Sequence, residues 1–115
     1  MDQFVHSQNL LRYMDLLERE TDPGRRARIS DLLVEEMGRF GGALERLAEV
    51  DRLIAGAQMR VRRQSGLLCH MPVDAQAHPL AANVLANLEQ TLGLLLDHRE
   101  LLRRGLGPED GSLPN

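Results

Sequence analysis

Side chains that can bind a metal ion gather in one short segment, at Cys69, His70, Asp74 and His78. Zinc accepts thiolate, imidazole and carboxylate ligands, and a flexible loop can fold around it. The spacing matches no established zinc finger, however, and adjacent residues such as Cys69 and His70 point apart in most backbones. We therefore predict no metal site and no other cofactor. A metal-dependent sensor centred on residues 69–78 stays open as an alternative.

A second segment with chemical potential is Asp97-His98-Arg99-Glu100, which invites comparison with the phosphoacceptor helix of sensor histidine kinases. The proline that follows in that motif is absent, and 115 residues leave no room for an ATP-binding domain. The sequence also shows no nucleophile-and-base pairing and no glycine-rich phosphate loop placed after a strand. These observations predict that the protein is not an enzyme and has no catalytic residues.

Arginines form local groups near residues 25–28 and at Arg60, Arg62 and Arg63, which could contact phosphates. The formal net charge is nevertheless −3, whereas nucleic-acid binding normally shows a basic excess. Only one Tyr, two Phe and no Trp are present, so platforms for base stacking have almost no material. A nucleic-acid partner is therefore not expected, and a nucleic-acid-associated regulator that uses the arginine clusters is kept as the runner-up.

The elements that must position these side chains are helical, because apolar residues recur at steps of three and four. The pattern predicts helices over about 2–20, 23–64 and 79–104, with Asp22 as an N-cap and Pro23 in the first turn of the second helix. The Gly41-Gly42 pair leaves a bend in the second helix open, and one continuous or gently kinked helix is favoured. Residues 66–78 form the connector between the last two helices. We expect one all-α domain over 1–107, a three-helix antiparallel bundle with a long central helix, and a disordered tail over 108–115.

The third predicted helix carries a heptad-like apolar seam, which is typical of helix pairing in a coiled coil. Its apolar positions outnumber what a three-helix monomer can bury, so we expect a homodimer that completes the bundle. A charged residue, Arg99, interrupts the seam, and we expect it to pair with Glu45 or Glu49 across a helix interface. The predicted interface residues are Leu85, Leu88, Leu92, Leu95, Leu96, Arg99 and Leu102.

Residues 9–36 contain the pattern N-x-x-R-Y-x-x-L-L, then E-T-D-P-x-R-R, then L-L-x-E-E. This stretch resembles a short helical hairpin found in small uncharacterised bacterial proteins. The resemblance covers about a quarter of the chain and implies a hairpin that packs against other helices rather than one that reads DNA. It implies no activity.

The cysteine content and the longest apolar stretch indicate where in the cell the protein is expected. Cys69 is the only cysteine, so no internal disulfide can form and a cytoplasmic location is expected. The longest apolar stretch, Leu80 to Leu96, is interrupted by polar residues, which argues against a bilayer span and a membrane partner. The function that fits these expectations is a small interaction or regulatory module whose apolar helix faces bind another protein, with a homodimer as the first assembly.

Overall fold

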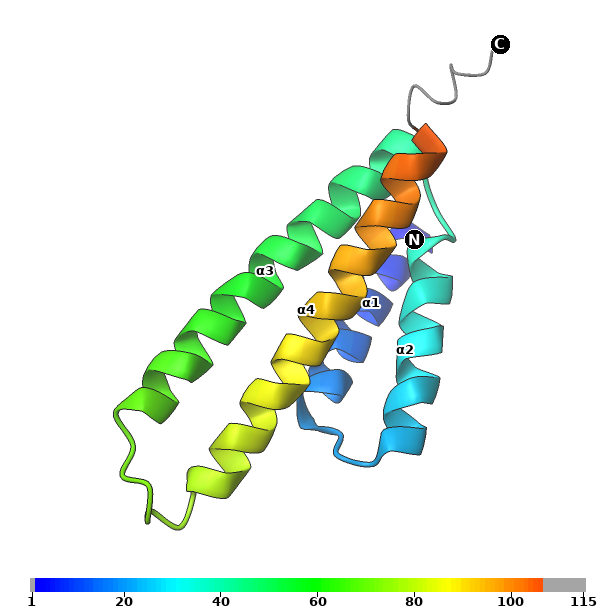
Figure 1. Ribbon diagram of the computed structural model, residues 1–115. Helices are drawn as coiled ribbons and strands as arrows, with labels where there is room; N and C mark the ends of the chain where they lie inside the picture. The colour runs from blue at the N-terminus through cyan, green and yellow to red at the C-terminus, as the bar shows by residue number, and fades with distance from the viewer. Residues whose placement is uncertain (1, 107–115) are drawn as a thin grey trace.

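The computed structural model describes residues 2–106, and these residues form four helices joined by short connections. The helices are α1 (Asp2–Arg19), α2 (Pro23–Met37), α3 (Ala43–Cys69) and α4 (His78–Leu106). They alternate in direction, so that α1 and α3 run one way and α2 and α4 run the other (Figure 1). No strand occurs in these residues, which confirms the all-α prediction. The predicted tail over 108–115 lies outside the described part of the chain.

The tight turn between α1 and α2 forms as its sequence predicts. Asp22 has an extended backbone, and its carboxylate accepts a hydrogen bond from the Arg25 backbone N–H at 2.9 Å. Pro23 opens α2, where a missing N–H removes no helical hydrogen bond. The two helices therefore fold back on one another as an antiparallel hairpin.

The prediction of one central helix over 23–64 was wrong, because the chain breaks between Met37 and Ala43. Gly41 has a φ of +85°, a left-handed conformation that side chains with a Cβ rarely adopt. Gly42 caps the start of α3, and its backbone N–H donates to the Glu45 carboxylate. The apolar stripe continues across the break because α2 and α3 both turn that stripe toward one core.

The core lies between the α1–α2 hairpin and the N-terminal half of α3 with the C-terminal half of α4. Its most deeply buried side chains are Leu17, Leu33, Val50 and Leu95, none of them more than 1% exposed. Each of the four helices supplies one of these residues. The hydrophobic stripes read from the sequence are therefore satisfied largely within a single chain.

The helices differ in length, and this difference shapes the molecule. The 27 residues of α3 and 29 of α4 compare with 18 and 15 for α1 and α2. At 1.5 Å per residue, α3 and α4 are roughly 40 Å long, and α1 is about 27 Å. The end of the α3–α4 hairpin that holds residues 70–77 therefore projects past the α1–α2 turn (Figure 1).

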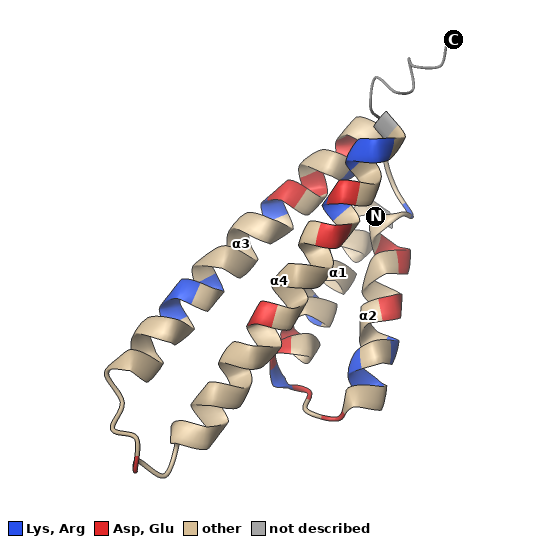
Figure 2. Cartoon of the chain, in the orientation of Figure 1, with Lys and Arg blue, Asp and Glu red and all other residues tan. Residues whose placement is uncertain are grey.

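Charged side chains are unevenly distributed along the bundle. Red and blue segments occur on all four helices, whereas the projecting end of α3–α4 is almost entirely tan (Figure 2). None of the helices in the described residues has the length and apolarity needed to cross a membrane.

Candidate functional site

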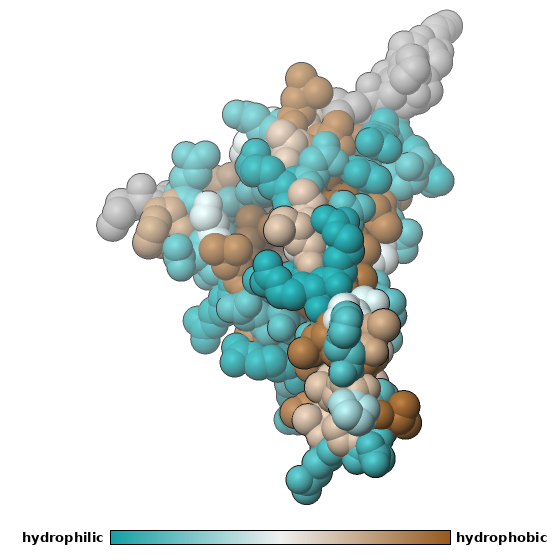
Figure 3. Space-filling model, turned by 90° about the vertical axis from the view of Figure 1, so that its left-hand side faces the viewer, coloured by the Kyte–Doolittle hydropathy of each residue, from teal (hydrophilic) through white to brown (hydrophobic). Residues whose placement is uncertain are grey.

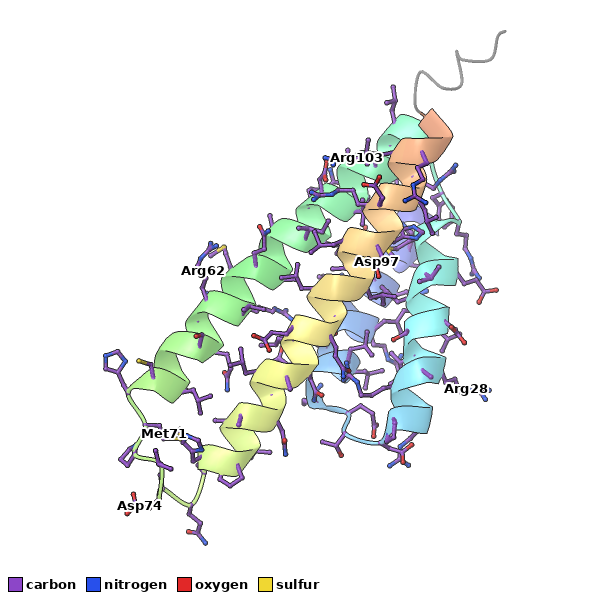
Figure 4. The ribbon with its side chains drawn as sticks, viewed as in Figure 1. Arg28, Arg62, Met71, Asp74, Asp97 and Arg103 are labelled. Carbon is purple, nitrogen blue, oxygen red and sulfur yellow. The ribbon has the colours of Figure 1, made fainter. Side chains whose placement is uncertain are left out.

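The side chains weighed as metal ligands do not converge in the structure. Cys69 ends α3 and is exposed, and His70 caps that helix with its ring Nδ1 2.8 Å from the Gly66 carbonyl oxygen. Asp74 points into solvent at the far end of the connection (Figure 4), and His78 begins α4. Within residues 2–106, no group of three or more His, Cys, Asp or Glu side chains is arranged to hold a metal ion.

His98, the residue compared with a phosphoacceptor, is half-buried on α4. Burial lowers the pKa of His98, and the nearby positive charge of Arg46 lowers it further. Its Nε2 atom is buried and has no hydrogen-bond partner among the described residues. A phosphoacceptor nitrogen must be reachable by a nucleotide, so this geometry offers no support for that chemistry.

The arginine clusters are divided between separate tasks. Arg60 turns toward α1 and pairs with Glu18 at 3.1 Å and Asp15 at 3.5 Å. Arg62 points away from the bundle (Figure 4). Near the start of α2, Arg25 pairs with Glu20 at 3.1 Å and Arg26 turns inward. Neither cluster forms one continuous cationic surface.

The predicted interface seam on α4 is used mainly inside the chain. Leu88 and Leu95 are buried, at 5% and 0% exposure, and they belong to the intramolecular core. The other seam residues are half-buried, namely Leu85, Leu92, Leu96, Arg99 and Leu102. Arg99 reaches across to α3, but its partner is Asp51 at 3.4 Å rather than Glu45 or Glu49. Glu49 is instead engaged by α1.

Sequence reasoning missed a buried polar cluster at the N-terminal end of α1, which we term the His6 clamp: His6, Asn9, Glu36 and Glu49. The His6 ring lies 2.7 Å from Glu36 through Nδ1 and 2.8 Å from Glu49 through Nε2. Asn9 donates to the other Glu36 oxygen at 3.3 Å. The clamp therefore joins α1 to both α2 and α3.

The geometry of the His6 clamp determines the protonation of its ring. Both ring nitrogens face carboxylate oxygens, so both must donate, which requires the imidazolium form. Burial lowers the pKa of His6, but the hydrogen bonds and charges of Glu36 and Glu49 outweigh burial and leave the pKa above 6.5. With both nitrogens engaged, the ring has no lone pair for a metal ion.

The sequence did contain a signal for this cluster. His6 stands one helical turn before the buried Leu10, and Glu36 lies between the buried Leu33 and Met37. Each is a polar residue within an apolar stripe, and such a residue requires a partner when it is buried.

A second polar cluster, which we term the Arg26 junction, secures the other end of α1 through Arg26 and Asn87. The Arg26 guanidinium donates to the carbonyl oxygens of Leu17 and Glu20, and Asn87 donates to those of Glu18 and Glu20. These carbonyls stand at the C-terminal end of α1, where helical partners are missing. Side chains from α2 and α4 therefore cap α1.

The surface with the clearest capacity to bind another protein is the projecting end of α3–α4, which we term the tip and define as residues 65–86. Between Arg63 and Glu89, Asp74 is the only Asp, Glu, Lys or Arg. Large apolar side chains are nevertheless exposed there: Leu67 is 53% exposed, Val73 84% and Leu80 65%. The tip combines depletion of charge with exposed apolar groups, as protein interfaces do at their centres.

Comparison with known proteins gives no further guidance to this site. No protein family matches the chain, and no curated protein or solved structure matches it either. The resemblance of residues 9–36 to a bacterial helical hairpin therefore stays a prediction.

Proposed function

We propose that the protein is a non-enzymatic interaction module whose tip binds another protein chain. The observation that carries the proposal is the near absence of charge in the tip, where Asp74 is the only Asp, Glu, Lys or Arg, on a hairpin end that projects past α1 and α2. Exposed surfaces normally carry interspersed charges, and a contiguous surface without them favours association. A cytoplasmic location is part of the proposal and rests on the single cysteine.

The first occupant that we propose for the tip is a second copy of the chain. In a dimer with two-fold symmetry, the same surface of both chains forms the interface, so charged residues of this surface come close to identical charges of the partner. A surface with few charges therefore avoids repulsion between like charges. The tip also continues the α3–α4 surface that α1 and α2 cover nearer the other end of the bundle. A second tip placed there would supply the two missing helices and extend the four-helix packing.

The proposal also changes which residues form the predicted dimer interface. Leu88 and Leu95 serve the core of one chain, so contacts between chains fall to exposed apolar residues nearer the tip. Leu67 and Leu80 are the principal candidates, and the half-buried Leu85 of the original prediction can contribute beside them.

Light scattering over a range of protein concentrations tests the proposal. We expect the wild-type mass to approach that of a dimer, and the double variant Leu67→Glu/Leu80→Glu to remain monomeric because two carboxylates would enter the interface on each side. The matched control is Leu44→Glu, which changes a leucine that is 72% exposed at the opposite end of α3. A wild-type monomer at all concentrations, or equal effects of the control and the double variant, would refute self-association through the tip.

The two alternatives have distinct signatures. A nucleic-acid-associated regulator would purify with nucleic acid and release it steeply as salt rises, because phosphate binding displaces counterions. A sensor centred on residues 69–78 would retain zinc after purification without an affinity tag. We expect neither result, and either one would replace the interaction proposal.

A further inference from the structure

A second surface lies between α1 and α3 and does not involve the tip. These two helices run in the same direction, and three adjoining hollows of about 290, 110 and 300 Å³ follow the line between them. Arg52 lines the first and second hollows, and Arg60 lines the second and third. Together the hollows form one groove, which we term the α1–α3 groove and which extends along most of α1.

The centre of the α1–α3 groove is apolar. The middle hollow is lined by Leu11, Met14, Leu53, Gly56 and Ala57 between the two arginines. Leu11 is 52% exposed, and a Cβ placed on Gly56 would meet nothing within 4 Å. The floor at Gly56 is therefore open to a close approach by another backbone. Figure 3 looks onto the α3 side and shows hydrophobic residues exposed there among hydrophilic ones.

The acidic side chains that line the ends of the α1–α3 groove already have partners. The Glu45 carboxylate accepts the Gly42 backbone N–H, and Glu49 pairs with His6. At the other end, Asp15 and Glu18 both pair with Arg60.

The charges left without partners in the α1–α3 groove are two cations. Arg52 and Arg63 make no ion pair with a carboxylate in the described part of the chain. They stand about three helical turns apart on α3, or roughly 16 Å at 1.5 Å per residue. Guanidinium groups form their strongest hydrogen bonds with carboxylates and phosphates.

We propose that the α1–α3 groove binds an acidic amphipathic helix of a partner protein. The apolar centre would accept leucine-like side chains, and Arg52 and Arg63 would each receive a carboxylate. Since the two arginines share one side of α3, the matching helix carries carboxylates at positions i and i+11, with apolar residues at i+4 and i+7 between them. An apolar centre flanked by only two unpaired cations suits such a helix better than a nucleic acid, which requires a continuous row of cationic contacts.

The probe is a capped, fluorescently labelled helical peptide of Ala and Gln with Glu at i and i+11 and Leu at i+4 and i+7. Fluorescence anisotropy should show saturable binding, at least tenfold weaker for the peptide with both Glu changed to Lys. The variant Arg52→Glu/Arg63→Glu should reverse this preference and bind the Lys peptide more tightly. No binding of the Glu peptide at about 1 mM, or equal binding of both peptides, would overturn the proposal.

A second variant separates blocking of the groove from loss of the fold. Gly56→Gln should fill the open floor and abolish peptide binding while preserving the helix, because Gly is a poor helix former. The matched control is Gly93→Gln on α4, which lies outside both the tip and the lining of the groove and also meets nothing within 4 Å. Peptide binding that survives Gly56→Gln would refute the groove as the site. The proposal would also be refuted if Gly56→Gln abolished binding of an oligonucleotide or of a second copy of the chain but not binding of the peptide.

Discussion

The His6 clamp and the Arg26 junction fasten opposite ends of α1 to the rest of the bundle by different chemistry. In the clamp, an imidazolium is held between the carboxylates of Glu36 and Glu49. In the junction, a guanidinium and the Asn87 amide donate to backbone carbonyls. The clamp depends on a group that titrates near neutral pH, whereas neither donor of the junction changes charge there. One end of α1 is therefore pH-sensitive and the other is not.

The largest effect that we expect is from His6→Ala. This change leaves Glu36 buried at 4% side-chain exposure, with Asn9 and the more distant Arg39 (3.8 Å) as its remaining partners. Removing one member of a buried ion pair costs about 3–5 kcal/mol of unfolding free energy. Urea denaturation measures this loss at pH 6. A loss below about 1 kcal/mol would mean that the clamp contributes little to stability and that the comparison fails.

The Arg26 junction should show a smaller loss. Asn87→Ala removes the donor to the Glu18 carbonyl and one of the two donors to the Glu20 carbonyl, which Arg26 still reaches. The part-buried Glu18 acceptor left unsatisfied costs about 1–3 kcal/mol. Asn83→Ala, one turn earlier on α4 at an exposed position, is the matched control and should change stability little. The loss from Asn87→Ala should be the same at pH 6 and pH 8. A loss that varies with pH would remove the distinction between the two ends.

Raising the pH should weaken the clamp without any substitution. Because the pKa of His6 is raised in the folded protein, its contribution is fully present below about 6.5 and is lost as the pH rises through the raised value. The charged groups around the ring are Glu36 from α2, Glu49 from α3 and Arg39 near Glu36. The effect should be smaller than that of His6→Ala, since the neutral ring still packs against Phe40 at 4.9 Å between ring centroids.

Urea denaturation from pH 5.5 to 9, with His6→Gln as the reference, measures the contribution of the charged His6 ring to the free energy of unfolding. The difference in unfolding free energy between wild type and His6→Gln should shrink as the pH rises. A difference that stays constant or grows would show that the ring is not held as an imidazolium.

The smallest effect should come from an exposed pair. Arg99 and Asp51 are 3.4 Å apart at 27% and 48% side-chain exposure, and exposed ion pairs contribute about 0–1 kcal/mol. Arg99→Leu should therefore shift the melting temperature by only a few degrees and leave the mass in light scattering unchanged. A large shift in either readout would mean that Arg99 determines how the helices pair and that burial is not what distinguishes the clamp.

The positions of the helices along the sequence were easier to predict from local sequence than the pairs of helices that pack together. Asp22 and Pro23 indicate the α1–α2 turn, and the seam from Ala81 to Leu102 indicates α4, because these signals lie within a few residues of one another. A bend at Gly41-Gly42 was left open, but one continuous helix was favoured because the apolar spacing continues across the break between α2 and α3. Gly41 needs its left-handed conformation only once α3 folds back beside α2.

The candidate sites depend on helix rotation, which spacing alone does not determine. Arg99 meets Asp51 rather than Glu45 or Glu49 because the facing of α3 and α4 selects among acidic residues less than two turns apart. The charge-poor segment of the tip is visible in the sequence, but its exposure follows from the shorter reach of α1 and α2. The α1–α3 groove likewise requires the relative placement of two helices distant in the chain.

The alternating order of the helices also bears on how quickly the chain reaches its native state. Each helix contacts the one that follows it, and α3 with α4 forms the most extensive of these neighbouring pairs. Chains dominated by such local pairings fold in microseconds to milliseconds, because little loop entropy is lost before contacts form. The α3–α4 hairpin is thus expected to act as the nucleus. The α1–α2 hairpin should dock onto it mainly through α1, because α1 packs more extensively on α4 than α2 does on α3.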